Sequence, residues 1–263
     1  MPGCFLSVRQ GCALTLLFAL SNMHAGAQGD GGPQHPFPTA ETLHYSVEWH
    51  MISAGTALLR IEPTKGSKSP QWDVKVQLES IGVVSKLYKL DDKYTVHLED
   101  QLCATSSDMD SSEGKKHHST KVTYDRARDH ATYVERDLVR NTTVSTKETP
   151  IPGCVADVIS GLYKLRTMQL QPGQSVQIPT SDGRKSAQVR IEAQEREEIK
   201  NRLGRFKTIR YEAFIFNGVI YSKKARMFVW LTDDARRLPV QIRARMAFPI
   251  GSITLELEKD EHL

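Results

Sequence analysis

The stretch LHYSVEWHMISAGTALLRI (residues 43–61) decides the fold class of this chain. Apolar residues alternate with polar ones up to Met51, which puts the apolar side chains on one face of a β-strand. The small residues Ser53–Gly55 are typical of a turn, and the alternation resumes over Ala57–Ile61. The stretch therefore predicts a β-hairpin with one buried face.

The same alternation recurs after nearly every cluster of Gly, Pro or Asp. The main repeats are Trp72–Leu78, Tyr94–Leu98, Val189–Ala193, Ile209–Ile215, Val240–Phe248 and Ile253–Leu257. About a dozen short strands joined by turns favour a mainly β fold built on a curved antiparallel sheet. The pattern leaves open whether that sheet is an open barrel, a spiral or sandwich-like.

One segment has helical periodicity. Between the pairs Pro152-Gly153 and Pro172-Gly173, apolar residues recur three and four positions apart. The flanking Pro-Gly pairs supply a start and a stop. This predicts a single amphipathic helix near residues 154–170, which we expect to pack inside the concave face of the sheet and close the core.

The first residues have the pattern of an export signal. Arg9 precedes an apolar run over Cys12–Leu20, and Ala25–Ala27 matches a cleavage site. The run is too short to span a membrane as a helix, so no transmembrane span is expected after cleavage. We predict a signal peptide over residues 1–27.

After the signal we predict a flexible lead-in over residues 28–41, where Gly and Pro are frequent. The exported β domain is predicted over residues 42–263, either as one body or as two halves that divide near residues 150–173.

Of the 4 cysteines, Cys4 and Cys12 fall in the signal, which leaves Cys103 and Cys154. Two cysteines in an oxidising compartment most simply form one disulfide. The alternative is a reactive thiol, but neither cysteine has a flanking motif that would lower its pKa. We therefore predict a bridge that pins the start of the helix to the segment around Cys103.

Charge and motifs exclude several function classes. Lys and Arg number 35 against 31 Asp and Glu, so the net charge of +4 is too small to drive nucleic-acid binding by bulk charge. No nucleophile elbow, phosphate loop, dinucleotide fingerprint or paired-histidine zinc motif occurs. We predict no catalytic residue, metal ligand or cofactor, although an enzyme without a local signature stays open.

Four charged residues are the candidate ligand-binding site: Asp233, Asp234, Arg236 and Arg237. They lie between two predicted strands. Clustered carboxylates and guanidinium groups can hold a phosphate, sugar or carboxylate, because arginine presents a planar fork of donors. The alternative is a hairpin turn in which the aspartates accept local backbone hydrogen bonds.

Several strings together suggest a family: Ala54–Ala57, Ser85–Tyr94, Asp157–Arg166, Val229–Val240 and Ile250–Ile253. The block Trp-Leu-Thr-Asp-Asp with Arg-Arg-Leu-Pro-Val is the most specific. In this order they resemble a bacterial family of exported proteins, the domain of unknown function 3108. The resemblance implies envelope localisation and a mostly antiparallel β fold, and it carries no activity.

Two functions remain. The first is a non-enzymatic protein of the periplasm or cell envelope that binds a lipid-like ligand or an envelope partner on its concave apolar side. Aromatic and methionine residues on the predicted strand faces motivate it: Trp49, Met51, Trp72, Trp230, Met246 and Phe248. The alternative is a polysaccharide-binding module or a hydrolase acting on an envelope glycan, with Asp233, Asp234 and Arg236 at its site.

Overall fold

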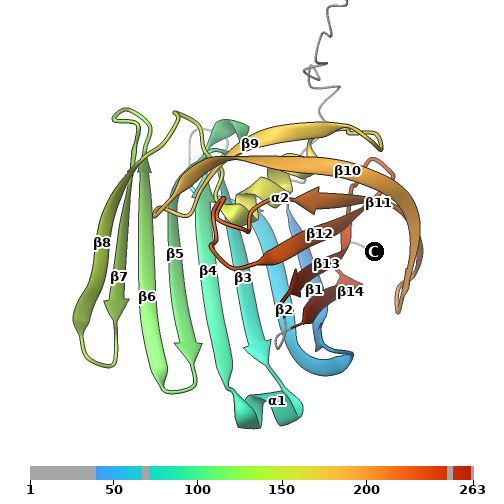
Figure 1. The fold of residues 1–263 in the computed structure, drawn as a ribbon, viewed down its shortest axis with the longest axis horizontal. Coiled ribbons are helices and arrows are strands. Elements are labelled where there is room, and N and C mark those ends of the chain that lie inside the picture. Colours follow the sequence, from blue (N-terminus) through green and yellow to red (C-terminus); the bar gives the residue numbers. More distant parts are fainter. Residues whose placement is uncertain (1–39, 67–70, 248–250, 262–263) are drawn as a thin grey trace, which may run out of the picture.

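The alternating segments form one antiparallel sheet in a computed structural model that describes residues 40–66, 71–247 and 251–261 (Figure 1). The strands are β1 (Glu41–Trp49), β2 (Ile52–Pro63), β3 (Trp72–Ser80), β4 (Leu90–Leu98), β5 (Ala104–Glu113), β6 (Lys116–Asp125), β7 (His130–Asp137), β8 (Thr142–Pro150), β9 (Ser175–Ser181), β10 (Ser186–Asn201), β11 (Gly204–Ala213), β12 (Ala225–Thr232), β13 (Pro239–Met246) and β14 (Ser252–Asp260). The prediction of a mainly β fold with a curved antiparallel sheet is confirmed.

The strand order is β8-β7-β6-β5-β4-β3-β2-β1-β14-β13-β12-β11-β10-β9. Except for β8 and β9, strands that follow one another in the chain pair antiparallel, as in hairpins. The one long-range pairing joins β1 to β14 in the middle of the sheet. The sheet therefore has two wings, β1–β8 and β9–β14, and its edge strands β8 and β9 do not pair with each other. The sheet is therefore single, curved and open at its two edges, which corresponds to the open barrel among the three predicted forms.

Helix α2 (Val158–Arg166) lies between the two wings, below β9 and β10 in Figure 1. The predicted helix near 154–170 is therefore correct but shorter. Residues 154–157 precede the helix, and Ala156 forms a parallel bridge to Thr180 of β9. A second helix, α1 (Gly82–Leu87), connects β3 to β4 and was not predicted.

Buried side chains form two apolar clusters: the larger draws on the first wing and on β12–β14, and the smaller belongs to the second wing. The larger cluster contains Tyr45, Val74 and Tyr163, and the smaller contains Leu165 and Ile191. Helix α2 supplies a residue to each cluster, so it fills the space between the wings as expected for a helix on a concave face.

The predicted turn at Ser53–Gly55 is wrong. These residues belong to β2, and the turn is His50–Met51, where both residues have positive φ angles of 48° and 66°. Gly55 instead marks a close approach, because a Cβ atom there would lie 2.4 Å from the backbone oxygen of Glu79 in β3. Glycine at this position is therefore a requirement of strand pairing, not of a turn.

The predicted signal peptide over residues 1–27 and most of the lead-in over residues 28–41 lie outside the described residues. From residue 41 to residue 260 the described strands belong to one hydrogen-bonded sheet. No helix among the described residues is long and apolar enough to cross a membrane.

Candidate functional site

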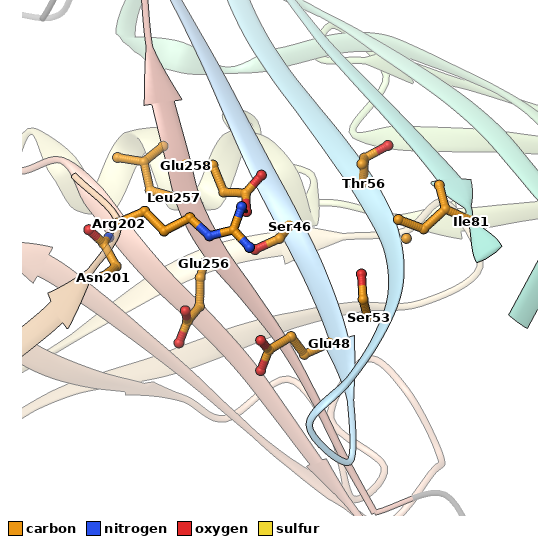
Figure 2. Close-up of a pocket in the computed structure, with 11 residues that line it drawn as sticks. Ser46, Glu48, Ser53, Thr56, Ile81, Asn201, Arg202, Glu256, Leu257 and Glu258 are labelled. Carbon is orange, nitrogen blue, oxygen red and sulfur yellow. Dashed lines mark ion pairs between the residues drawn. The ribbon is translucent and has the colours of Figure 1, made fainter. Parts of the chain in front are cut away.

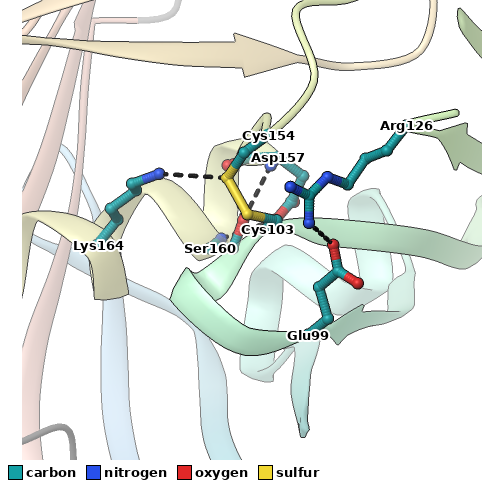
Figure 3. Close-up of a disulfide and its surroundings, with 7 residues drawn as sticks. All are labelled: Glu99, Cys103, Arg126, Cys154, Asp157, Ser160 and Lys164. Atoms are coloured by element: carbon teal, nitrogen blue, oxygen red, sulfur yellow. Dashed lines mark hydrogen bonds and ion pairs between the residues drawn. A yellow bond between two sulfur atoms is a disulfide. The ribbon is translucent and has the colours of Figure 1, made fainter. Parts of the chain in front are cut away.

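The predicted disulfide is present. Cys103 and Cys154 are bridged, with their Cα atoms 5.1 Å apart (Figure 3). Cys103 lies at the start of β5 and is fully buried. The bridge excludes the alternative of a free reactive thiol in this form of the protein. It fixes the segment before α2 to the β4–β5 corner.

The residues after Cys154 join the two wings. The backbone oxygen of Val155 accepts a 2.8 Å hydrogen bond from Ala104 of β5. The next residue, Ala156, donates to the backbone oxygen of Pro179 at 2.9 Å and accepts from Ser181 at 2.9 Å. One short segment thus bonds to β5 on one side and to β9 on the other. It spans the gap that the sheet leaves open.

Asp157 fixes the start of α2. Its carboxylate accepts hydrogen bonds from the backbone nitrogens of Ser160 at 2.7 Å and Ile159 at 3.1 Å, and the Ser160 hydroxyl accepts from the Asp157 nitrogen at 2.8 Å. This reciprocal arrangement is a capping box. The Tyr94 hydroxyl of β4 donates to the same carboxylate at 2.6 Å. The helix is therefore positioned by the first wing.

A polar pocket of about 130 Å³ lies beside this cap. We call it the tyrosine pocket. It is lined by Tyr94, Ser107, Met109, Thr120, Val122, Tyr124, Tyr133, Asp157, Val158, Ser181, Asp182, Arg184 and Tyr221. Both wings contribute, because β4–β7 face the β9–β10 turn across it. Arg184 of that turn lies over the Tyr133 ring at 5.2 Å and pairs with Asp182 at 3.2 Å.

The tyrosines of this pocket are neutral phenols over the physiological pH range. Burial raises the pKa of Tyr94, Tyr124 and Tyr221 above 10, and the Asp157 carboxylate raises each further. Neutral phenols both donate and accept hydrogen bonds and present flat apolar faces. The pocket is therefore suited to a ligand with several hydroxyl groups.

A second cavity, of about 120 Å³, lies on the other side of α2. We call it the apolar cavity. It is lined by Val158, Ile159, Gly161, Leu162, Leu165, Ile178, Thr180, Val189, Ile191, Ala213, Ile215, Met227, Val229 and Ile242. None of these described lining residues is charged. The helix supplies one wall and β9–β13 supply the other. Val158 lines both the apolar cavity and the tyrosine pocket.

The predicted ligand residues form the connection between β12 and β13. Asp234 accepts hydrogen bonds from the backbone nitrogens of Arg236 at 3.0 Å and Arg237 at 3.1 Å, and from the Thr232 hydroxyl at 2.7 Å. Asp233 pairs with Arg196 at 2.8 Å. These contacts are those of a turn in which an aspartate accepts local backbone hydrogen bonds.

The two arginines of this connection point to different partners. Arg236 pairs with the buried carboxylate of Asp260. Arg237 is 3% exposed, donates to the Tyr211 hydroxyl at 2.7 Å and lies over the Tyr211 ring. Every one of the four predicted residues therefore has an internal contact, and their role in binding a ligand stays a prediction.

A further pocket of about 230 Å³ lies where the β10–β11 turn approaches β1, β2 and β14. In Figure 2, Arg202 reaches across it, and the Arg202 guanidinium pairs with Glu258 at 2.9 Å. Burial raises the pKa of Glu256, and the nearby Glu48 raises it further. No group of three or more metal-ligating side chains occurs among the described residues. We assign this pocket no ligand.

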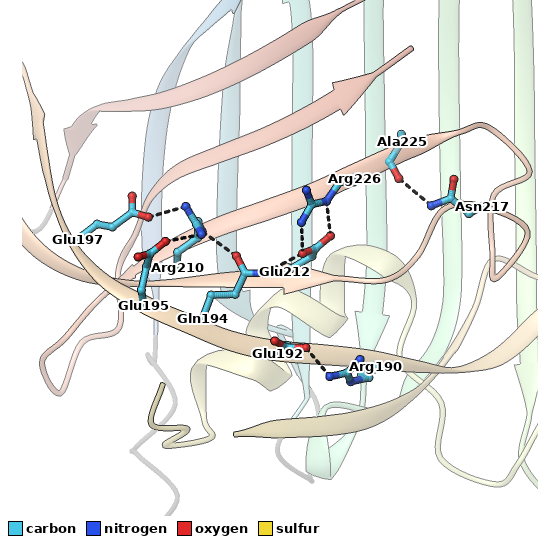
Figure 4. Close-up of polar contacts among 10 residues, drawn as sticks. All are labelled: Arg190, Glu192, Gln194, Glu195, Glu197, Arg210, Glu212, Asn217, Ala225 and Arg226. Atoms are coloured by element: carbon cyan, nitrogen blue, oxygen red, sulfur yellow. Dashed lines mark hydrogen bonds and ion pairs between the residues drawn. The ribbon is translucent and has the colours of Figure 1, made fainter. Parts of the chain in front are cut away.

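Ion pairs also cover the outer face of the second wing (Figure 4). Arg210 pairs with Glu195 and Glu197, both at 2.6 Å, and Arg226 makes two hydrogen bonds to Glu212 at 2.7 and 2.6 Å. These charges satisfy one another. They explain the run of mixed charges after residue 194 without a ligand.

Neither the tyrosine pocket nor the apolar cavity was predicted from the sequence. Tyr94, Tyr124 and Tyr133 each occupy an inward position of a strand, which the alternation does indicate. The alternation does not predict that these strands face Tyr221 and Arg184, which are distant in the sequence. Only the curvature of the sheet brings them together.

A comparison with curated protein sequences found no match. Among solved structures, a β-barrel-like protein of the domain of unknown function DUF1849 from Brucella abortus superposes with a TM-score of 0.51 at 8% identity, covering 84% of this chain and 97% of that one. A candidate exported protein with a YmcC-like fold from Bacteroides fragilis aligns at 9% identity with a TM-score of 0.33, covering 87% and 98%. The first likeness supports the open-barrel fold.

The resemblance noted in the sequence is confirmed by the family model. That model matches residues 44–258, from the first strand of the sheet to the last. The chain therefore belongs to the family of proteins of unknown function DUF3108.

Proposed function

We propose that this protein is a non-enzymatic protein of the bacterial periplasm or cell envelope that binds a lipid-like ligand. The observation that carries the proposal is the apolar cavity between α2 and β9–β13. Small-molecule sites are typically concave and lined mainly by apolar side chains. A dry apolar cavity of about 150 Å³ takes up a molecule as large as benzene. The volume of about 120 Å³ suits a short apolar group or the end of an acyl chain.

The surroundings of the cavity support an amphiphilic ligand. The apolar cavity meets the tyrosine pocket at Val158, so an apolar chain and a polar group of one molecule have adjacent places. The Cys103–Cys154 bridge supports export, because disulfides persist in oxidising compartments. The signal pattern over residues 1–27 supports it independently.

Filling the cavity tests the proposal. Ala213 lines the cavity at the end of β11, so Ala213→Phe would occupy the space that an apolar chain needs. Ala127→Phe, in the exposed β6–β7 turn, is the matched control. We expect oleate to bind the wild-type protein and the control, as measured by native mass spectrometry, and to bind Ala213→Phe at least tenfold more weakly. Equal binding by all three proteins would contradict the proposal.

The second candidate is a module that binds an envelope glycan, and the tyrosine pocket favours it. Aromatic faces and neutral hydroxyls are groups that bind sugar rings. If a glycan is the ligand, Tyr221→Phe weakens oligosaccharide binding while Ala213→Phe leaves it unchanged. If a lipid is the ligand, Ala213→Phe has the larger effect. Titration of both variants with both ligands separates the two candidates.

A further inference from the structure

One end of the first wing carries nearly all of the large exposed apolar side chains. Because consecutive strands are antiparallel, the β1–β2, β3–β4, β5–β6 and β7–β8 connections all lie at the same end, the lower edge in Figure 1. We call these four connections the apolar end. Its exposed apolar residues, counting those on the adjoining strand ends, are Trp49, Met51, Ile52, Ile81, Val83, Leu87, Tyr88, Leu138, Val139 and Val144. Among the described residues, Leu203 is the one other large apolar side chain of comparable exposure.

Three side chains of the apolar end are exposed over most of their surface. Met51 is 92% exposed, Leu87 82% and Val83 69%. Helix α1, which carries Val83 and Leu87, buries none of its residues. Apolar side chains gathered at one end, not scattered singly, mark an interaction surface. The described residues do not cover these apolar side chains.

The charges at the apolar end are mainly positive. With the strand residue on either side of each connection included, this end carries Lys86, Lys89, Lys115, Lys116 and Arg140 against Glu113 and Asp137. Across the described residues, Lys86, Lys89 and Lys115 take part in no ion pair.

We propose that the apolar end docks on the surface of an anionic lipid bilayer. Apolar side chains that enter the boundary between headgroups and acyl chains, combined with basic residues that face anionic lipid, are the features of interfacial membrane binding. Trp49 and Tyr88 fit this boundary, where tryptophan and tyrosine are enriched. A second copy of the chain is a poorer occupant, because two ends of the same positive charge repel each other.

Membrane docking is a further property beside ligand binding in the apolar cavity. The residues of the apolar end do not line the apolar cavity, so the two proposals can be tested independently. The apolar end gives the protein a fixed orientation on the membrane, with the strands of the first wing running away from the bilayer.

Vesicle sedimentation tests this proposal. The mature protein is mixed with vesicles of phosphatidylcholine alone, or of phosphatidylcholine and phosphatidylglycerol in equal amounts. We expect binding to the anionic vesicles that weakens as salt is added. Because each basic group near an anionic surface contributes about a fivefold gain in affinity, the variant Lys86→Gln with Lys89→Gln is expected to bind roughly 25-fold more weakly. The variant Val83→Asp with Leu87→Asp is expected to lose binding.

Matched variants control for general effects. Leu203→Asp places one negative charge at an exposed leucine in the β10–β11 turn, and Arg128→Gln removes one positive charge at the opposite end of the first wing. Both should bind as the wild type does. All variants change exposed side chains, and circular dichroism confirms that they fold. The absence of binding to anionic vesicles, or an equal loss in Leu203→Asp and in Val83→Asp with Leu87→Asp, would overturn the proposal. So would a dimer without vesicle binding that Leu87→Asp dissociates, because it would assign the apolar end to a second copy.

Discussion

Glu41 and Arg166 form a buried ion pair that joins the first strand to the last turn of α2. The two hydrogen bonds between them measure 2.6 and 2.9 Å, and both side chains are 3% exposed. Because removal of one partner leaves the other charge buried, Glu41→Ala should lower the free energy of unfolding by about 3–5 kcal/mol. Urea unfolding measures this change.

The control is Glu62→Ala, which breaks a half-exposed pair with Lys75. Exposed pairs contribute at most about 1 kcal/mol. A loss of the same size in both variants would show that Glu41 does not hold the helix in place.

Glu212 gives the protein one source of acid sensitivity. Hydrogen bonds from Arg226 hold the pKa of Glu212 below its ordinary value of 4.5. A carboxylate whose folded pKa is lowered stabilises the protein above the ordinary pKa, and that contribution is lost as the pH falls through the folded pKa. Glu212→Gln should therefore flatten the fall in stability below about pH 4.5.

Unfolding in urea over a series of pH values measures the slope. Glu198→Gln is the control, because Glu198 pairs with Arg205 at an exposed position. An unchanged slope in Glu212→Gln would contradict this role of the Arg226 pair.

At the scale of elements, Asp157 holds α2 against β4. Asp157→Ala removes the helix cap, which costs about 1 kcal/mol. It also leaves the buried Tyr94 hydroxyl without its acceptor, which costs about 1–3 kcal/mol more. Asp157→Asn retains an acceptor oxygen and should lose less than half as much. Thermal or urea unfolding of both variants measures the difference, and equal losses would mean that the cap itself contributes little.

The sequence predicts individual strands and helices better than it predicts which strands pair with each other. Alternation identified most of the strands but not β5, β8 or β9. Helical spacing between two Pro-Gly pairs identified α2. The turn at His50–Met51 was missed because neither residue is a glycine, although both adopt positive φ angles. Cysteine counting identified the Cys103–Cys154 bridge, since only two cysteines remain after the predicted signal.

The arrangement of the elements could not be predicted. Pairing of β1 with β14 joins residues at opposite ends of the chain, and no local pattern specifies it. The candidate site depends on that arrangement, because Tyr94, Tyr221 and Arg184 meet only when the two wings curve toward each other. The turn at Asp233–Arg237 could be recognised from the sequence, because its hydrogen bonds join residues close together in the chain.

The β9–β10 turn of the second wing packs against β6 of the first wing, across the open side of the sheet. A Cβ atom at Gly183 would lie 2.6 Å from a methyl group of Val122 in β6, and the φ angle of Gly183 is +82°. Gly183→Ala should therefore push the second wing away from the first. Gly173→Ala is the control, because Gly173 has a φ angle of +88° but no atom within 4 Å.

Both substitutions carry the backbone cost of a left-handed residue, about 1–2 kcal/mol. Gly183→Ala should cost about 1–3 kcal/mol more, because the packed contact has no room. Urea unfolding measures both variants. An equal cost would mean that the two wings do not press together at this turn.

The proposed lipid-binding site is the apolar cavity between α2 and β9–β13. The most direct measurement is the intact mass of the protein, produced in an oxidising compartment, purified gently and weighed under native and then denaturing conditions. The denatured mass should be two hydrogens below that of the reduced chain, because of the Cys103–Cys154 bridge. We expect a native mass above the chain mass, with the excess lost on denaturation and matching an amphiphile. A bare chain mass from the wild-type protein, together with no uptake of added oleate, would contradict the proposal.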